Sequence, residues 1–374
     1  MKLKKGSMSS LAQQVRKSGK GIIVYGAGVI GGVAAPYWLR RCQLDEAVLC
    51  YVDADVRKQG TTIPLGSRAV PVRSLNALEE HRGTYILLIT VSAFMPVIAS
   101  LEQIPGTEEA EAYFLPVMLV ENAHTPKAGG AVRTSETPLI PKKIHYTWFS
   151  GEPIPSSLQA CIDSWKRFCP DYEIIRWDTG NYDVSKYQYT KQAYELRKWG
   201  FIADVARLDI LYQNGGIYLD VDVELIRNMD ELLYQPAFCG VEKWGTVNMG
   251  GGSGACPQNP VIKAMLDNRK DEPFVHGDQA LNLTTCGYYE TFPLVREGLE
   301  INNTTQEIAG GMMTVYASEY FQPFDYMSGE IRLTPNTFSI HHFSGTWLGP
   351  EAAEKRAETR RNYRELLGRL EESI

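Results

Sequence analysis

Residues 20–120 show short, continuously apolar runs that alternate with helical patterns. The runs at 21–25, 47–52 and 85–89 have the length of strands, and residues 26–42 read as a glycine loop followed by a helix. Strands that are apolar along their whole length are typical of a parallel sheet covered on both faces. The pattern therefore predicts an α/β domain over residues 20–125, preceded by a polar tail at residues 1–19.

Two uncharged stretches, at residues 21–39 and 83–101, are about as long as a membrane span. Glycines and a proline interrupt the first, and Thr90, Ser92 and Pro96 interrupt the second. We interpret both stretches as buried strand-plus-helix units of the same α/β domain.

Residues 121–140 are rich in Thr, Gly, Ala and Pro and have no periodic apolar pattern. This composition predicts a linker at residues 126–139, followed by a second α/β domain over residues 140–350. Residues 351–374 have the composition of a charged C-terminal helix.

The charge balance and the cysteines exclude several classes of protein. The 374 residues carry 38 Lys+Arg against 44 Asp+Glu, a formal net charge of −6, and no basic run that would favour nucleic acid. The seven cysteines are scattered, and none forms a CxxC pair. We therefore expect a reducing compartment and a cytoplasmic protein, with peripheral contact at the inner face of a membrane left open. The oligomeric state is not predicted.

A glycine motif follows the first predicted strand directly. Gly26, Gly28 and Gly31 open the next helix, and Asp53 ends the following strand. Small residues let a pyrophosphate approach a helix N-terminus, while an acidic side chain accepts a ribose hydroxyl. The segment resembles the small Rossmann-like domain of bacterial sugar acyltransferases. Nucleotide binding at these four residues and a purely structural role both remain open.

The most informative segment runs from residue 201 to residue 224. Its first half predicts a helix that ends at Asn214-Gly215-Gly216. A strand with strict alternation is expected next, with Asp220, Asp222 and Glu224 on one face. Carboxylates on one face repel each other unless a cation lies between them, and oxygen ligands suit Mg²⁺ or Mn²⁺. On the preceding helix, Asp204 and Arg207 are three residues apart and share a face.

These residues resemble the sugar-binding region of family 32 glycosyltransferases, which include bacterial capsule enzymes and fungal mannosyltransferases. The family pattern has an Asp and an Arg three apart, then Gly-Gly-x-Tyr-x-Asp-x-Asp; this chain has both, from Asp204 to Asp222. Two further family signatures occur here as residues 140–148 and 342–347. The resemblance implies a GT-A-type catalytic domain after the Rossmann-like domain, a nucleotide-sugar donor and a Mn²⁺ or Mg²⁺ cofactor.

The resemblance also implies a role for each matching residue. Asp220 would meet the donor sugar, Asp222 would ligate the metal, and His342 or Ser344 would complete the metal shell. The implied donor-binding residues are Trp148, Asp204, Arg207, Tyr218, Asp220, Asn248 and Trp347. We interpret His145 and His341 as structural histidines.

Two segments depart from the family pattern. Residues 248–254 are unusually glycine-rich, which is consistent with an acceptor-side loop or with a flexible turn. Asp278 and Gln279 resemble the Asp-Gln pair of related retaining galactosyltransferases, which adds them to Asp204, Arg207 and Asp220 as candidate catalytic residues. The N-terminal cap of a helix would explain the same two residues equally well.

The resemblance thus implies a metal-dependent glycosyltransferase of capsular or exopolysaccharide synthesis, with retention at the anomeric carbon taken from the family. It would transfer a sugar from a nucleotide sugar, first of all a UDP-sugar, to a glycan or lipid-linked saccharide. Two alternatives stay open: a non-catalytic sugar-nucleotide-binding protein, and an oxidoreductase or epimerase centred on residues 26–31.

Overall fold

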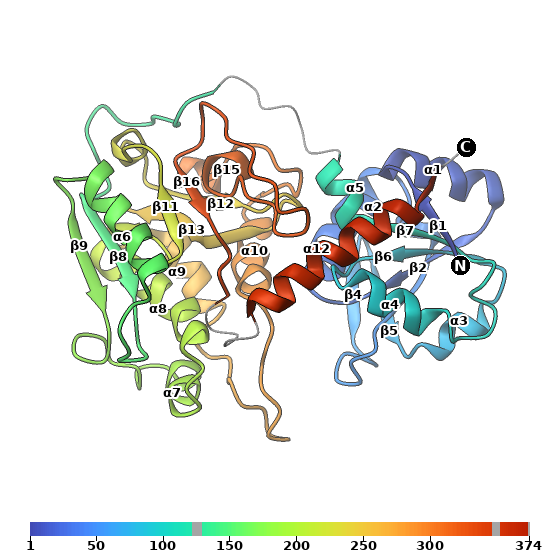
Figure 1. The fold of residues 1–374 in the computed structure, drawn as a ribbon. Coiled ribbons are helices and arrows are strands. Elements are labelled where there is room, and N and C mark those ends of the chain that lie inside the picture. Colours follow the sequence, from blue (N-terminus) through green and yellow to red (C-terminus); the bar gives the residue numbers. More distant parts are fainter. Residues whose placement is uncertain (122–128, 346–351, 373–374) are drawn as a thin grey trace. The chain divides into compact units, whose positions relative to one another are not determined.

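The computed structural model describes residues 1–121, 129–345 and 352–372. The chain divides into two compact units, each considered by itself. Unit 1 comprises Met1–His124, Tyr326–Gly329 and Glu354–Ile374, and unit 2 comprises Thr125–Asp325 and Glu330–Ala353. Each unit is a mixed α/β structure built on a large sheet of its own (Figure 1).

The sheet of unit 1 is parallel apart from one edge strand. Its order is β17 (Glu371–Glu372), β1 (Lys2–Lys5), β7 (Glu111–Phe114), β6 (Tyr85–Ile89), β2 (Gly21–Tyr25), β3 (Val48–Val52), β5 (Arg68–Arg73) and antiparallel β4 (Thr62–Leu65). The predicted strands at 21–25, 47–52 and 85–89 are confirmed to within one residue. All five residues of β6 are buried, so both faces of the sheet are covered.

Helices of unit 1 connect and cover these strands. They are α1 (Met8–Ser18), the π-helix η1 (Ile30–Ala34), α2 (Ala35–Arg41), the 3₁₀ turn η2 (Asp45–Ala47), α3 (Asn76–Glu80), α4 (Phe94–Leu101), α5 (Leu115–Glu121) and α12 (Ala352–Arg369). Within the part of the chain that the structure describes, no helix is both long and apolar enough to cross a membrane.

The two ends of the chain are built into unit 1. Residues 1–19, expected as a polar tail, instead form β1 and α1, because Met8, Leu11, Ala12 and Val15 make a buried stripe at helical spacing. At the other end, Tyr363 of α12 packs on Phe94 with 6.2 Å between ring centroids, and β17 pairs with β1. The C-terminal helix is therefore part of the N-terminal unit.

Unit 2 holds a mixed seven-stranded sheet and a separate strand pair. The large sheet has the order β14 (Gln306–Ile308), β15 (Met313–Tyr316), β12 (Ala237–Val241), β13 (Val247–Ala255), β10 (Gly216–Tyr218), β8 (Lys143–Thr147) and β9 (Glu173–Trp177). The pair consists of β11 (Val223–Leu225) and β16 (Ser339–His341), which run antiparallel.

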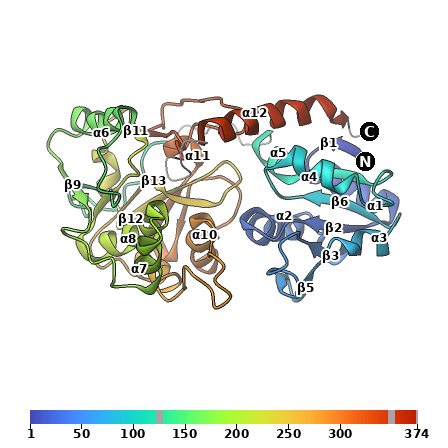
Figure 2. The ribbon, with the colours of Figure 1, turned by 60° about the horizontal axis from the view of Figure 1, so that its bottom comes forward.

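Helices of unit 2 pack beside this sheet, with α7 and α8 side by side (Figure 2). They are α6 (Ser156–Phe168), α7 (Gln188–Glu195), α8 (Trp199–Asn214), the 3₁₀ turn η3 (Asp230–Leu233), α9 (Pro260–Asp267), α10 (Cys286–Arg296), the 3₁₀ turn η4 (Ala309–Gly311) and α11 (Ser318–Phe321). The predicted helix before Gly215-Gly216 is confirmed as α8.

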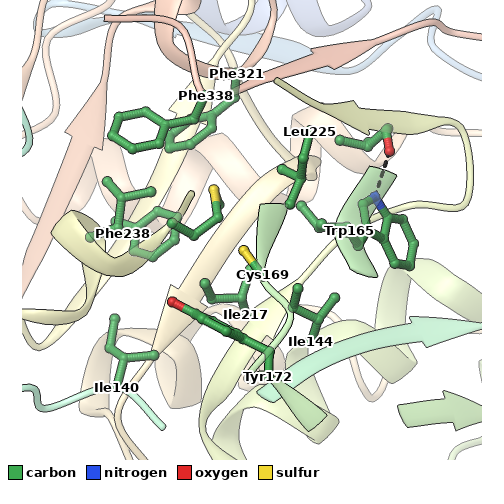
Figure 3. Packing of buried hydrophobic residues seen from close by; sticks show 14 of the residues in the cluster. Ile140, Ile144, Trp165, Cys169, Tyr172, Ile217, Leu225, Phe238, Phe321 and Phe338 are labelled. Carbon is green, nitrogen blue, oxygen red and sulfur yellow. Dashed lines mark hydrogen bonds between the residues drawn. The ribbon is translucent and has the colours of Figure 1, made fainter. Parts of the chain in front are cut away.

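An apolar core joins the large sheet to the strand pair (Figure 3). Trp165 of α6 is fully buried, and its indole N–H donates a 2.7 Å hydrogen bond to the carbonyl of Val223 in β11. Phe321 and Phe338 pack with 6.0 Å between their ring centroids, next to the start of β16. The core thus fixes β11 and β16, the two strands that flank the site described next.

Candidate active site

The two aspartates of the Asp-x-Asp sequence lie in a tight turn. The expected continuous strand over 217–224 is wrong: β10 ends at Tyr218, and β11 begins at Val223 in the other sheet. The Val223 N–H donates to the Asp220 carbonyl at 3.0 Å, which closes the turn. The turn brings the two carboxylates together by bending the backbone and not by alternation along a strand.

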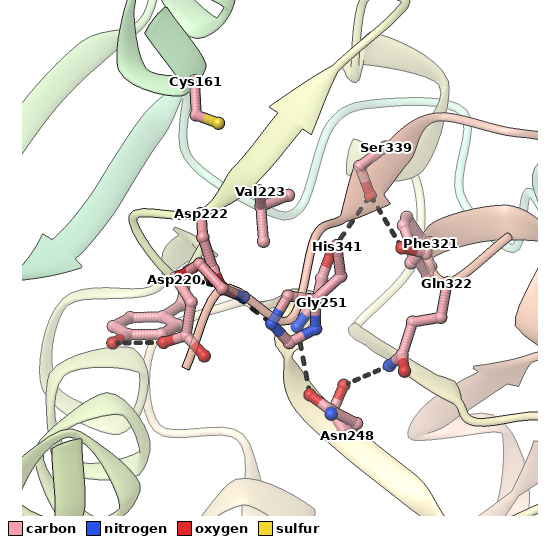
Figure 4. A network of polar contacts seen from close by, with 12 residues as sticks. Cys161, Asp220, Asp222, Val223, Asn248, Gly251, Phe321, Gln322, Ser339 and His341 are labelled. Carbon is pink, nitrogen blue, oxygen red and sulfur yellow. Dashed lines mark hydrogen bonds and ion pairs between the residues drawn. The ribbon is translucent and has the colours of Figure 1, made fainter. Parts of the chain in front are cut away.

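Asp222 lies beside His341 of β16 (Figure 4) and is also held by the segment that follows this strand. One carboxylate oxygen accepts hydrogen bonds from the backbone N–H of Ser344 at 2.7 Å and from its hydroxyl at 2.8 Å. The other oxygen lies 3.4 Å from Nε2 of His341. Burial acts to raise the pKa of Asp222, but His341 and the Ser344 donors outweigh it and lower that pKa well below its usual range. Asp222 is therefore an anion at neutral pH.

Asp220, Asp222 and His341 form a group that fits a metal ion. Each offers one ligand atom, and these atoms lie within 4.8 Å of one another. Two carboxylate oxygens and one imidazole nitrogen suit a divalent cation such as Mn²⁺. The negative charge that Asp222 carries would be neutralised there, so the residues present fit the predicted cofactor.

The histidine in this group differs from the one expected. His342 points its Nε2 to Glu224, 3.0 Å away, and both side chains are more than one-third exposed. His341 occupies the place beside Asp222, because β16 pairs with β11 in the register that sets His341 opposite Val223. His341 was interpreted as structural, and a His-His doublet in the sequence does not reveal which ring faces the aspartates.

Arg207 of α8 is a buried cation shared by three carboxylates. Its guanidinium nitrogens lie 3.0 Å from Asp204, 3.3 Å from Glu290 and 3.6 Å from Asp220. Burial acts to lower the pKa of Arg207, but these carboxylates raise it above its ordinary value. The expected pairing of Asp204 with Arg207 on one helix face is present in the structure.

Glu290 is the part of this cluster that the sequence analysis missed. It lies on α10, is 1% exposed, and also accepts a hydrogen bond from the Met249 N–H at 2.9 Å. Burial raises the pKa of Glu290 to about 7. It is 83 residues from Arg207 along the chain, so no local pattern could have indicated the contact.

The glycine-rich segment near Asn248 is a buried strand and neither a loop nor a flexible turn. It forms β13, whose nine residues are all buried. A Cβ atom on Gly250 would lie 2.0 Å from a carboxylate oxygen of Asp220 and 3.0 Å from Nη1 of Arg207. Glycine is therefore required there by the close approach of the site residues.

The remaining donor-binding candidates lie at the ends of β8, β10 and β13. The Tyr218 hydroxyl donates to Asp220 at 3.1 Å and contacts the Thr147 hydroxyl at 3.0 Å. Trp148 is partly exposed, and its indole N–H donates to the Glu152 carbonyl. The Asn248 amide donates to Glu242 at 3.0 Å.

Asp278 and Gln279 lie exposed in a hairpin turn, not at a helix start. A bridge between Val275 and Leu281 closes the hairpin, and Asp278 accepts a hydrogen bond from the Ala280 N–H within it. Trp347 lies outside the described residues. The expectations for these three residues therefore rest on resemblance alone.

In unit 1, Asp53 bonds to the glycine loop at Ala27, and Gly26 and Gly31 approach each other closely. The Asp53 carboxylate accepts the Ala27 N–H at 2.8 Å and the Lys58 ammonium at 3.1 Å. A Cβ on Gly31 would lie 1.9 Å from the Gly26 carbonyl oxygen, whereas one on Gly28 would meet open space. Gly26, Gly31 and Asp53 thus have structural reasons to be present, and Gly28 has no steric one.

Comparison with known proteins identifies the segment around this site. Residues 155–239, which include Asp204, Arg207, Asp220 and Asp222, match the family described as "Glycosyltransferase sugar-binding region containing DXD motif". The chain is 36% identical over 119 residues to "Inositol phosphoceramide mannosyltransferase 3" of Schizosaccharomyces pombe, covering 29% of this chain and 31% of that protein.

Two further relatives extend the comparison. "Mannosyl phosphorylinositol ceramide synthase SUR1" of Saccharomyces cerevisiae is 37% identical over 112 residues, which is 27% of each chain. "Uncharacterized glycosyltransferase L373" of Acanthamoeba polyphaga mimivirus is 27% identical over 194 residues, covering 50% of this chain and 74% of that protein. The chain spans about a third of the length of the two fungal relatives. These matches support the prediction that this chain is an enzyme of the glycosyltransferase type.

Proposed function

We propose that this chain is a metal-dependent, retaining glycosyltransferase that takes a nucleotide sugar as its donor. The observation that carries the proposal is the convergence of Asp220, Asp222 and His341 beside the buried Asp204–Arg207 pair. A divalent cation bound there would supply positive charge to the diphosphate that departs from the sugar. We further propose that unit 2 is a GT-A-type domain and that unit 1 is a Rossmann-like domain.

Each residue of the site has a role in this proposal. Asp222, Asp220 and His341 hold the cation, and Ser344 orients Asp222 through its two hydrogen bonds. Asp204 and Arg207 hold hydroxyls of the donor sugar, because a carboxylate accepts and a guanidinium donates hydrogen bonds. In the reaction, the bond from the anomeric carbon to the phosphate oxygen breaks, and a bond to the acceptor oxygen forms on the same face. The departing diphosphate takes the proton of the acceptor hydroxyl.

The donor and the acceptor are proposed at the level of their class. A UDP-sugar is the first candidate donor, and Trp148 would stack on its base. The names of the fungal relatives make a mannose donor the second candidate and a phosphoinositol lipid an alternative to a polysaccharide acceptor. We propose that Mn²⁺ or Mg²⁺ is the cofactor and that the protein acts in the cytoplasm.

The test is hydrolysis of a panel of UDP- and GDP-hexoses by the purified full-length protein with Mn²⁺. We expect the release of nucleoside diphosphate from at least one donor, its loss with chelator, and its loss in Asp220→Asn. Asp163→Asn is a matched control, since Asp163 is an exposed residue of α6 that pairs with Lys166. Binding without hydrolysis or transfer would favour the non-catalytic alternative, and a co-purified nicotinamide cofactor would favour the oxidoreductase.

A further inference from the structure

Arg269 is a fully buried arginine held between two aromatic rings. It follows α9, is 1% exposed, and its guanidinium carbon lies 4.1 Å from the ring centroid of Tyr189 and 3.6 Å from that of Tyr289. The two tyrosines belong to α7 and α10. We call this arrangement the tyrosine clamp of Arg269.

Within the part of the chain that the structure describes, the guanidinium in the clamp has no hydrogen-bond acceptor. Among the described residues, none of its three nitrogens has a hydrogen-bond partner, and neither does the buried Tyr189 hydroxyl. The aromatic faces attract the cation, but burying a charge without an acceptor is costly. A buried cation held in this way must be compensated by negative charge nearby.

Aromatic packing places the clamp on the side of α8 that carries Asp204. Phe201, one turn before Asp204, packs on Phe274 with 5.1 Å between ring centroids. Phe274 packs in turn on Tyr189 at 5.1 Å. Residues three apart on a helix share a face, so Asp204 projects toward the same region as Phe201.

Asp204 needs a second cation because its first is shared. Arg207 also serves Glu290 and Asp220, so one positive charge faces three carboxylates. Burial raises the pKa of Asp204, and Arg207 and Arg269 act against that rise. The charged or titratable groups around Asp204 are Tyr189 on α7, Arg207 on α8, Asp220, Arg269, and Cys286 and Glu290 on α10.

We propose that Arg269 is a positioning residue of the donor-sugar site, which acts by placing the clamped charge beside Asp204. The charge keeps the carboxylate of Asp204 ionised and able to accept a hydrogen bond from a sugar hydroxyl. The tyrosine clamp holds the charge in place without consuming the hydrogen-bonding capacity of Asp204. This role rests on the proposed function, since it assigns Asp204 to the sugar.

A first experiment tests the interaction between Arg269 and Asp204 without any ligand. A double-mutant cycle of Arg269→Met and Asp204→Asn is measured by urea unfolding of the full chain. We expect the double variant to lose less stability than the sum of the two single losses. Additive losses of stability would overturn the proposal, whichever donor the enzyme hydrolyses.

The cycle has a matched control and a second variant. Arg296 also stacks on an aromatic ring, that of Phe292, at 4.7 Å, but it is exposed, and we expect Arg296→Met to be additive with Asp204→Asn. If Arg269→Met does not fold, the cycle is run with Arg269→Lys, which keeps the charge. That variant is then expected to lose less of the coupling than a neutral Arg269→Gln.

A second experiment separates positioning from general structure. With the UDP- or GDP-hexose of the panel that the wild type hydrolyses, we expect Arg269→Met to raise KM by about tenfold. Affinity for the free nucleoside diphosphate with Mn²⁺ should stay within twofold, and Arg269→Lys should recover most of the KM. Equal losses for sugar nucleotide and free diphosphate would contradict the proposal. If the wild type hydrolyses no donor of the panel, the proposed function fails, and the double-mutant cycle alone decides the role of Arg269.

Discussion

Arg207 and Glu290 form a buried ion pair, with 3.3 Å between Nη1 and Oε1, although 83 residues separate them along the chain. The pair joins α8 to α10, and through the Met249 N–H it also fixes β13. Arg207 is thereby held in one place beside Asp204 and Asp220. A donor site that depends on the direction of a guanidinium needs such a support.

The first prediction concerns the pH dependence that Glu290 gives to stability. Because burial raises its pKa to about 7, folding favours the protonated form of Glu290. Glu290 should not lower the free energy of unfolding below pH 4.5. Its destabilising effect should grow as the pH rises to about 7 and reach on the order of 3 kcal/mol. Unfolding of wild type and Glu290→Gln in urea between pH 5 and 8 measures this. The stability of the wild type relative to the variant should fall as pH rises, and a constant difference would contradict the assignment.

The second prediction concerns Gly250, whose lack of a Cβ atom leaves room for the Asp220 carboxylate. A methyl group there would displace Asp220, since the new Cβ would lie 2.0 Å from its carboxylate. We expect Gly250→Ala to lower Mn²⁺ affinity by more than about tenfold and to destabilise the fold by about 1–3 kcal/mol. Isothermal calorimetry and thermal unfolding check both effects. Gly277→Ala is the control, because its Cβ would meet nothing within 4 Å, and no change is expected there.

The third prediction concerns Asp222 as a metal ligand. Asp222→Asn keeps an oxygen that can accept the Ser344 hydrogen bonds but removes the charge that a cation would neutralise. We expect Mn²⁺ affinity to fall by about 10² while the melting temperature changes by only a few degrees. UDP should bind the wild type much more tightly with Mn²⁺ than with chelator. Equal UDP affinity in both conditions would remove Asp222 from the metal site.

The fourth prediction separates structure from ligand binding in the glycine loop of unit 1. Gly31→Ala should destabilise the protein by more than 1 kcal/mol, since its Cβ would meet the Gly26 carbonyl. Gly28→Ala should leave the melting temperature unchanged, because its Cβ meets open space. If the loop binds a nucleotide, Gly28→Ala alone should weaken that binding. Unchanged stability in Gly31→Ala would contradict the structure of the loop.

The sequence by itself determined the local elements whose pattern is complete within a few residues. The apolar runs predicted β2, β3 and β6, and the double glycine predicted the end of α8. The spacing of Asp204 and Arg207 indicated their contact, because residues three apart on a helix are neighbours in any fold. Local periodicity carries this information, since the backbone geometry of a helix or strand fixes which side chains share a face.

Tertiary structure alone decided which residues lie together at the candidate site. The register between β11 and β16 places His341, and not His342, beside Asp222. A turn and not a strand brings Asp220 close to Asp222, and α10 contributes Glu290. The glycines of β13 have no periodic signal, because distant residues fill the space of the missing Cβ atoms. At Gly250 these residues are Asp220 and Arg207, and at Gly252 the residue is Phe321. Contacts between distant segments depend on packing and register, which are set by the whole core and cannot be read from the neighbourhood of any one residue.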